Sequence, residues 1–165
     1  MKNRKRGFSL VELLIVLAVI AALIATITPV ALNAIRKSQA TKVAQNIKTL
    51  ASAIENAAYV NGYSDDGEIY SDASENTITI ADLGRDIAGD KYGIHYFFDD
   101  SEDEFEVVVF SAEEVHVATA QDVVTGLSAS FDKDSFFGAT ATTQKLGLTD
   151  TASGKLYYTF TFDIY

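Results

Sequence analysis

Residues 7–29 read GFSLVELLIVLAVIAALIATITP, and they decide the fold of this 165-residue chain. A basic stub with four Lys and Arg residues precedes them. From Gly7 to Ile35, Glu12 is the one charged residue. As a helix, the uncharged run of residues 13–35 is roughly 35 Å long, enough to cross a hydrocarbon core of about 30 Å. The run therefore predicts a membrane-spanning helix.

The flanks of this run differ from those of an ordinary secretory signal. Such a signal ends in small residues at a cleavage site, whereas Ala25, Thr26 and Thr28 lead straight into Pro29 without an AxA pattern. An uncleaved signal anchor explains the basic stub, because Lys and Arg hold the N-terminus in the cytoplasm. It does not explain Gly7, a residue without a side chain where a peptidase at the membrane face can grip extended backbone.

Glu12 carries a charge near the mouth of the apolar helix, where the charge must be compensated. Ser9 and Glu12 have the SxxE spacing of a capping box, in which Ser9 caps the helix and Glu12 reaches back to the backbone. A second role stays open, because cleavage before Phe8 frees an amine at the helix start of this chain or of a neighbour. A buried carboxylate that meets an opposite charge fixes geometry, so Glu12 is also a candidate register device between subunits.

Pro29 is the only proline of the chain. Inside a helix it removes one backbone hydrogen bond and crowds the carbonyl of Ala25, and the hydroxyls of Thr26 and Thr28 can satisfy the freed groups. Two interpretations follow. Pro29 either produces a harmless kink or marks a segment that loses helical structure when its surroundings change.

Taken together, residues 7–29 resemble the N-terminal signature of type IV pilins and of the related pseudopilins of type II secretion systems. The cleavage glycine Gly7, the aromatic residue Phe8, the acidic residue Glu12 and the later Pro29 align with this signature without a gap. The resemblance implies that a prepilin peptidase cuts between Gly7 and Phe8 and that Phe8 is N-methylated. It also implies assembly at an inner-membrane platform into a helical filament of identical subunits, with Glu12 facing the terminal amine of a neighbour.

The chain departs from this family in two features. Ala21, a better helix former, stands where many members carry a glycine, which disfavours melting ahead of Pro29. The chain has no cysteine, so its C-terminal region lacks the disulfide of many Gram-negative pilins and must be held by packing, hydrogen bonds or a metal. Zero cysteines also exclude thiolate metal sites.

The charge balance opposes nucleic acid as a direct partner. Without the four leader cations, nine Lys and Arg face 23 Asp and Glu, a net charge of −14. Binding to phosphates needs clustered cations.

Beyond Pro29 the apolar residues keep to one side of the predicted helix. They recur near a period of 3.6, at Ile35, Val43, Ile47, Leu50 and Ile54. The helix therefore continues out of the membrane as an amphipathic helix. We expect it to end near Asn61, because Gly62 is a natural cap.

The rest of the chain is mainly β in pattern. Residues 94–98 and 105–110 are β-rich runs around an acidic loop, and they predict a hairpin. Residues 115–119 predict a weaker third strand, and residues 156–164 alternate as a half-buried strand with one aromatic face, Tyr158, Phe160, Phe162 and Ile164. Residues 62–76 read as a connecting loop, and residues 126–154 read as a loop-rich region.

These patterns predict an α+β fold in which a long N-terminal helix packs on a C-terminal antiparallel sheet, as in the pilin fold. The stripe of Ile47, Leu50 and Ile54 is expected to lie across the aromatic face of that sheet. The expected organisation is a cleaved leader (residues 1–7), a transmembrane and assembly helix (8–35), an amphipathic helix half (36–61) and a β-rich head (62–165).

Two acidic clusters raise a calcium hypothesis, since hard cations take oxygen ligands. They are Asp65, Asp66, Glu68 and Asp72, and Asp99, Asp100, Asp103 and Glu104. Neither has EF-hand spacing, and acidic loops are more often simply solvated, so we expect no cofactor and no metal. His95 and His116 fall within predicted strands and read as ordinary strand residues.

We find no catalytic constellation in the sequence and expect no enzyme. The stretch GLSAS at residues 126–130 lacks the second glycine of a GxSxG elbow, and P-loop and HExxH motifs are absent.

The expected function is a structural subunit of an extracellular type IV pilus, whose precursor resides in the cytoplasmic membrane. A pseudopilin of a type II secretion system is the first alternative, because it needs the same Gly7, Phe8 and Glu12. The fairly large head and its Ser/Thr-rich loops, which offer surface for subunit contacts, favour the pilin. A membrane-anchored binding module is the second alternative, and it predicts an intact leader and a monomer in detergent.

Overall fold

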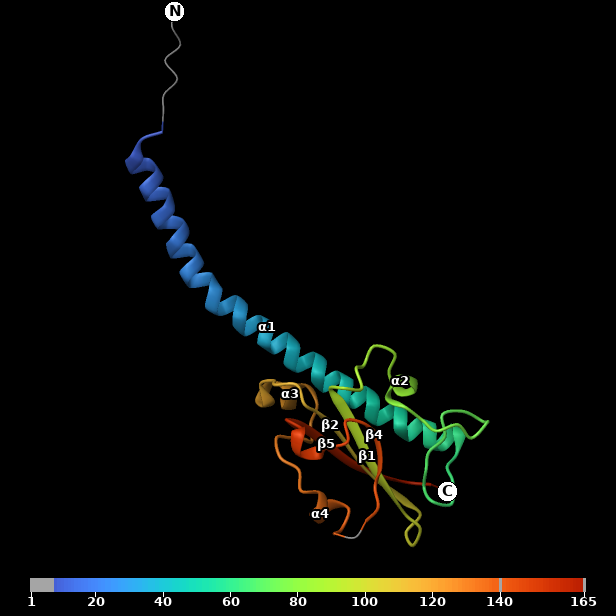
Figure 1. Cartoon of the computed structure of the whole chain (residues 1–165). Coiled ribbons are helices and arrows are strands. Elements are labelled where there is room, and N and C mark those ends of the chain that lie inside the picture. Colours follow the sequence, from blue (N-terminus) through green and yellow to red (C-terminus); the bar gives the residue numbers. More distant parts are fainter. Residues whose placement is uncertain (1–7, 140, 165) are drawn as a thin grey trace, which may run out of the picture. The chain divides into compact units, whose positions relative to one another are not determined.

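The computed structural model describes residues 8–139 and 141–164 (Figure 1). Its helices are α1 (Leu10–Asn61), α2 (Ile80–Leu83), α3 (Val117–Val123) and α4 (Lys133–Phe136), with a short 3-10 helix at Thr151–Ser153. Its strands are β1 (Tyr92–Asp99), β2 (Glu104–Ser111), β3 (Leu127–Ser128), β4 (Gln144–Gly147) and β5 (Leu156–Asp163). The chain divides into two compact units between Arg36 and Lys37. The second unit, from Lys37 onward, is called the head below.

The C-terminal end of α1 lies where the sequence predicts it. Asn61 is the last helical residue, and Gly62 follows with φ +79°. This left-handed conformation favours glycine. The amide of Gly62 donates to the carbonyl of Ala58 at 3.2 Å, which closes the last turn. The predicted cap is confirmed.

The strands form a five-stranded sheet in the order β3-β5-β2-β1-β4, with every neighbouring pair antiparallel. β1 and β2 make the predicted hairpin, which pairs from Tyr92 opposite Ser111 to Asp99 opposite Glu104. β5 pairs with β2 along its whole length. The α+β arrangement of a long N-terminal helix followed by an antiparallel sheet is therefore confirmed.

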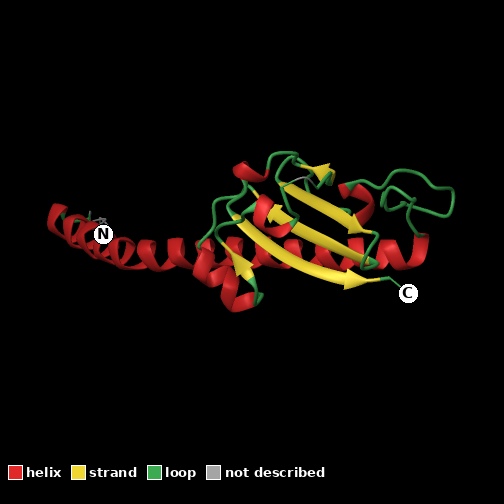
Figure 2. Cartoon of the chain, turned by 90° about the horizontal axis from the view of Figure 1, so that it is seen from below, coloured by secondary structure: helices red, strands yellow, loops and turns green. Residues whose placement is uncertain are grey.

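The core of the head lies between the sheet and the C-terminal part of α1, which runs along one face of the sheet (Figure 2). Ile47, Leu50 and Ile54 are fully buried there, as predicted. The sheet contributes Ile94, Tyr96, Phe105, Val107, Val109, Leu156 and Phe162. Burying each such side chain stabilises the fold by about 1.5–3 kcal/mol. The predicted aromatic face of β5 packs here as well, with Phe162 stacked on Phe105 at a centroid distance of 5.2 Å.

The other face of the sheet carries a second apolar cluster, which we call the outer cluster. Because side chains alternate along a strand, Val108 and Phe110 of β2 point away from α1 while Val107 and Val109 point toward it. The outer cluster consists of Val108, Phe110, Phe137 and Tyr157, with Phe97, Phe131, Phe136, Ala141 and Leu148 packed around them. The sequence does not predict this second layer.

One prediction about the head is wrong. Residues 115–119 are not a strand, because His116 caps α3 and its carbonyl accepts the amides of Thr119 and Ala120 at 3.1 and 3.2 Å. Local helical hydrogen bonds outweigh the β preference of Val115 and Val117 there. In the loop-rich region of residues 126–154, the short elements β3, α4, β4 and the 3-10 helix lie between loops.

Candidate functional site

The start of α1 is capped by its own side chains. Ser9 precedes the first helical residue, and its Oγ accepts the amide of Val11 at 3.3 Å. The amide of Ser9 donates to Oε2 of Glu12 at 2.8 Å. These two bonds satisfy two of the four amides that a helix start leaves free. The predicted capping box is confirmed, and it holds the Glu12 carboxylate beside the backbone that follows Phe8.

The helix behind this cap exposes its apolar side chains on all sides. Every residue from Phe8 to Gln39 is exposed, and Phe8 itself is 83 % exposed. An 18-residue window of α1 has a mean hydropathy of 2.9, and none of it is buried within the chain. By length and composition this helix can cross a membrane. A contiguous apolar surface of this kind needs a partner other than water.

Pro29 lies inside α1, and the backbone is helical on both sides of it. The hydroxyl of Thr26 donates to the carbonyl of Leu23 at 2.9 Å, and that of Thr28 donates to the carbonyl of Ile24 at 2.7 Å. The Ala25 carbonyl, which loses its usual donor to the proline, is therefore not the acceptor of either threonine. Both hydroxyls instead donate to backbone carbonyls one turn earlier in the helix.

The predicted site residues do not form one cluster. Glu12 and Phe8 lie together at the helix start, whereas Pro29 is 17 residues after Glu12, about 26 Å along a helix. Gly7 lies outside the described residues. The start of α1 thus brings one carboxylate close to Phe8, and Pro29 belongs to a different part of the helix.

In each acidic cluster of the head, one carboxylate caps a turn. Asp72 accepts the amide of Ser74 at 2.8 Å and the side-chain amide of Asn76. Asp99 accepts the amide and the hydroxyl of Ser101. The pKa values of both carboxyls are lowered, chiefly by the hydrogen bonds from Asn76 and Ser101. Within residues 8–139 and 141–164, no group of three or more His, Cys, Asp or Glu side chains is placed to hold a metal ion.

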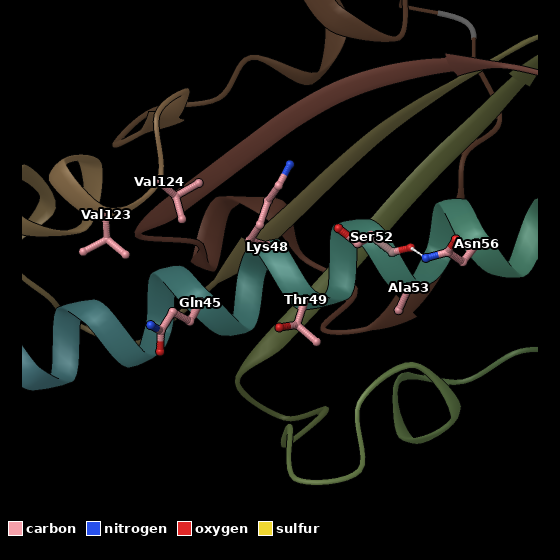
Figure 3. Close-up of a pocket in the computed structure, with 8 residues that line it drawn as sticks. All are labelled: Gln45, Lys48, Thr49, Ser52, Ala53, Asn56, Val123 and Val124. Atoms are coloured by element: carbon pink, nitrogen blue, oxygen red, sulfur yellow. Dashed lines mark hydrogen bonds between the residues drawn. The ribbon is translucent and has the colours of Figure 1, made fainter.

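A groove of about 760 Å³ runs along α1 in the head (Figure 3). Gln45, Lys48, Thr49 and Asn56 line its helix side, and Val123 and Val124 line the opposite side. The Lys48 amine donates to the hydroxyl of Tyr158 at 2.9 Å and lies 4.6 Å from the centre of that ring. The groove is lined by amides, hydroxyls and one amine, which is already hydrogen-bonded to Tyr158. Among these lining residues, no nucleophile lies beside a base.

Comparison with known protein families identifies the N-terminal segment. Residues 2–28 match the family model of the prokaryotic N-terminal methylation motif. This motif is the prepilin-leader signature of type IV pilins and pseudopilins, so the resemblance seen in the sequence is confirmed. It supports a type IV pilin or pseudopilin-like protein with a membrane-anchored precursor, and it implies processing by prepilin peptidase. No curated protein and no solved structure matches the chain.

Proposed function

We propose that this protein is a structural subunit of an extracellular type IV pilus and polymerises through α1. The observation that carries the proposal is the start of that helix. The Glu12 carboxylate is held by a cap directly after the proposed cleavage point. It lies at the N-terminal start of an apolar helix that is exposed on every side. Identical helices can cover one another in a bundle and remove this surface from water and lipid alike.

Processing creates the partner that Glu12 needs. In our proposal, prepilin peptidase cuts between Gly7 and Phe8, and the new amine of Phe8 is then methylated. The amine keeps its positive charge after one methylation. Inside the bundle, where water is excluded, the Glu12 carboxylate pairs with the terminal amine of a neighbouring subunit. A buried pair of this kind holds two subunits in one register, because an offset leaves both charges unpaired.

The same helix serves two surroundings in this proposal. Before assembly it spans the cytoplasmic membrane, with the basic stub on the cytoplasmic side. An inner-membrane platform then transfers the subunit into the filament, where lipid contacts are replaced by contacts with identical helices. Pro29 and the threonines before it form a segment of weaker backbone hydrogen bonding, which we propose as the place where the helix adapts to the filament.

The proposal assigns no chemical reaction to the head. Its groove offers hydroxyls, amides and the engaged Lys48, and its two acidic turns are closed by their own hydrogen bonds. We therefore propose a protein that is not an enzyme, needs no cofactor or metal, and does not bind nucleic acid through its own surface.

Intact mass of the protein from cells tests the processing. The proposal expects loss of residues 1–7 and a gain of about 14 Da for one methyl group. An unmethylated chain that keeps its leader and remains monomeric in detergent indicates a membrane-anchored binding module instead. The amount of this protein in filaments released from cells distinguishes a pilus from a pseudopilus. The pseudopilus of a secretion system is short and stays in the cell envelope.

Substitution of Glu12 tests the assembly. Glutamine at this position keeps the capping box, because SxxQ forms the same bonds as SxxE, so Glu12→Gln removes the charge and retains the helix start. We expect filament yield to fall at least about tenfold, the ratio that corresponds to 1.4 kcal/mol. Glu55→Gln, at the next carboxylate of α1, is the matched control and should leave the yield unchanged. Equal yields from the two variants contradict the assembly role of Glu12.

A further inference from the structure

A single stretch of chain covers the outer face of the sheet. It comprises residues 131–139 and 141–154, and we call it the cover segment. It contains α4, β4 and the 3-10 helix, and it supplies Phe131, Phe136, Phe137, Ala141 and Leu148 to the outer cluster. Its strand β4 pairs with β1 over only four residues. The cover segment is attached to the sheet by this short ladder, by the outer cluster and by Leu146, which reaches the main core. The Tyr157 hydroxyl of β5 also donates to the carbonyls of Thr151 and Gly154.

His95 lies in β1 beneath this segment and is 2 % exposed. Its Nε2 is 3.2 Å from the carbonyl oxygen of Leu148, which comes directly after β4. A carbonyl only accepts hydrogen bonds, so Nε2 carries the ring hydrogen and Nδ1 of the neutral ring is bare. Nδ1 is buried and has no hydrogen-bond partner among the described residues. The ring packs edge to face against Phe110, with the centroids 5.2 Å apart.

The groups around His95 disfavour its charged form. Val108 of β2 and Lys145 of β4 are its cross-strand neighbours. The charged groups that act on it are Lys145, Lys133 of α4, and Asp150 before the 3-10 helix. Burial lowers the pKa of His95 to about 4, and the two lysines add to this effect, while the Leu148 carbonyl and Asp150 oppose it.

We propose that His95 is a pH-sensitive latch, which holds the cover segment on the sheet when neutral and loosens it when protonated. Protonation adds a second N–H to the ring, at Nδ1, where the described residues offer no acceptor. A buried donor without an acceptor, on a charged ring, is strongly unfavourable. When β4 separates from β1, the imidazole ring of His95 becomes exposed to water. The core between α1 and strands β1, β2 and β5 can stay folded, because most of its side chains come from those elements.

The sign and size of the effect follow from the two protonation equilibria. In the open form His95 has its ordinary pKa of about 6.5, and in the closed form about 4. The open form therefore binds more protons, and opening becomes easier as the pH falls below about 6.5. Between pH 7.5 and 5.5 the equilibrium constant for opening rises about tenfold. Ordinary carboxylates, with pKa values near 4, stay ionised in this window.

Hydrogen exchange of the full chain in detergent micelles tests the latch. Rates are measured at pH 7.5 and 5.5 and corrected for the intrinsic pH dependence of exchange. We expect the corrected opening of the β4 amides, residues 144–147, to rise about tenfold, and that of the β2 and β5 amides to change little. His95→Gln keeps a side-chain amide that can donate to Leu148 but does not titrate, so it should abolish the rise. His116→Asn changes the only other histidine, places a residue type favoured at helix N-caps before α3, and should preserve the rise.

Three outcomes of the hydrogen-exchange experiment overturn the latch. They are a β4 opening that is independent of pH, a rise that persists in His95→Gln, and an equal rise in β2 and β5. If His95→Gln does not fold, the imidazole of the wild-type chain is titrated by NMR instead. A pKa of His95 well below the ordinary histidine value of about 6.5, together with the opening of β4, supports the latch, and an ordinary pKa of His95 overturns it.

Discussion

The hydroxyl oxygen of Tyr96 accepts a hydrogen bond from the backbone amide of Ile69 at 3.2 Å, and both residues are buried. Tyr96 belongs to β1, whereas Ile69 lies in the connection that follows α1. A buried amide needs a partner, and the side chain of a distant strand supplies it here. This bond fastens the first connection of the head to its sheet.

Removal of the Tyr96 hydroxyl should therefore destabilise the head. Tyr96→Phe keeps the ring in the core but leaves the Ile69 amide unpaired, so we expect the free energy of unfolding to fall by about 1–3 kcal/mol. Urea unfolding followed by near-UV circular dichroism of the tyrosines measures it. Tyr63→Phe is the control, because the ring of Tyr63 packs on Phe98 and Phe105 in the same core. Equal losses in the two variants contradict the fastening role.

The head should also lose stability in alkali. Burial raises the pKa of Tyr96 to about 12, although the bond from Ile69 opposes this. The unfolded chain loses the phenolic proton near pH 10, so the unfolded state binds fewer protons and stability falls as the pH rises through the range from about 10 to 12. Tyr96→Phe should flatten this dependence. Unfolding free energies measured at pH 9 and 11 test it, and an unchanged slope in the variant counts against it.

Gly147 should tolerate alanine poorly. It has φ +68°, and a Cβ there meets the carbonyl oxygen of Tyr92. Gly138 has φ +82°, but a Cβ there meets nothing within 4 Å. Both alanine variants carry the cost of the left-handed conformation, about 1–2 kcal/mol, and only Gly147→Ala adds a backbone clash. Urea midpoints should fall further for Gly147→Ala, and equal midpoints mean that β4 shifts to accept the methyl group.

Replacement of Pro29 should strengthen α1 locally. Pro29→Ala restores an amide that can donate to the Ala25 carbonyl, and a proline inside a helix costs about 3 kcal/mol. We expect backbone amides of residues 26–33 to exchange at least tenfold more slowly in micelles. Ala21→Gly should act in the opposite direction, speeding local exchange about fivefold, because glycine costs about 1 kcal/mol in a helix. Unchanged exchange in Pro29→Ala indicates that the helix is already fully protected there.

Local patterns in the sequence predict the elements that depend on them. The helix end at Asn61 depends on Gly62, and the bond between Ser9 and Glu12 depends on a spacing of three residues. Hydrophobic periodicity likewise predicts the buried stripe of α1 and the hairpin of β1 and β2, because long regular runs report which face is buried.

The elements that the sequence does not predict depend on distant partners or are short. β3 has two residues and β4 has four, too few for a repeating hydrophobic pattern to be recognised. The outer cluster draws Phe131, Phe136 and Phe137 from a polar stretch, and the one local signal is Asp132, which caps α4. His95 meets Leu148 across 53 residues, so no spacing in the sequence indicates its environment.

The first buried side chain of the described chain is that of Ala40. The residues before it add nothing to the interior of the head, so the free energy that folds the head is independent of what surrounds the apolar part of α1. In the proposed filament subunit, folding and polymerisation are then separate events. In our proposal a folded head waits at the membrane and leaves it without refolding, so that a cell keeps a reserve of subunits ready for assembly.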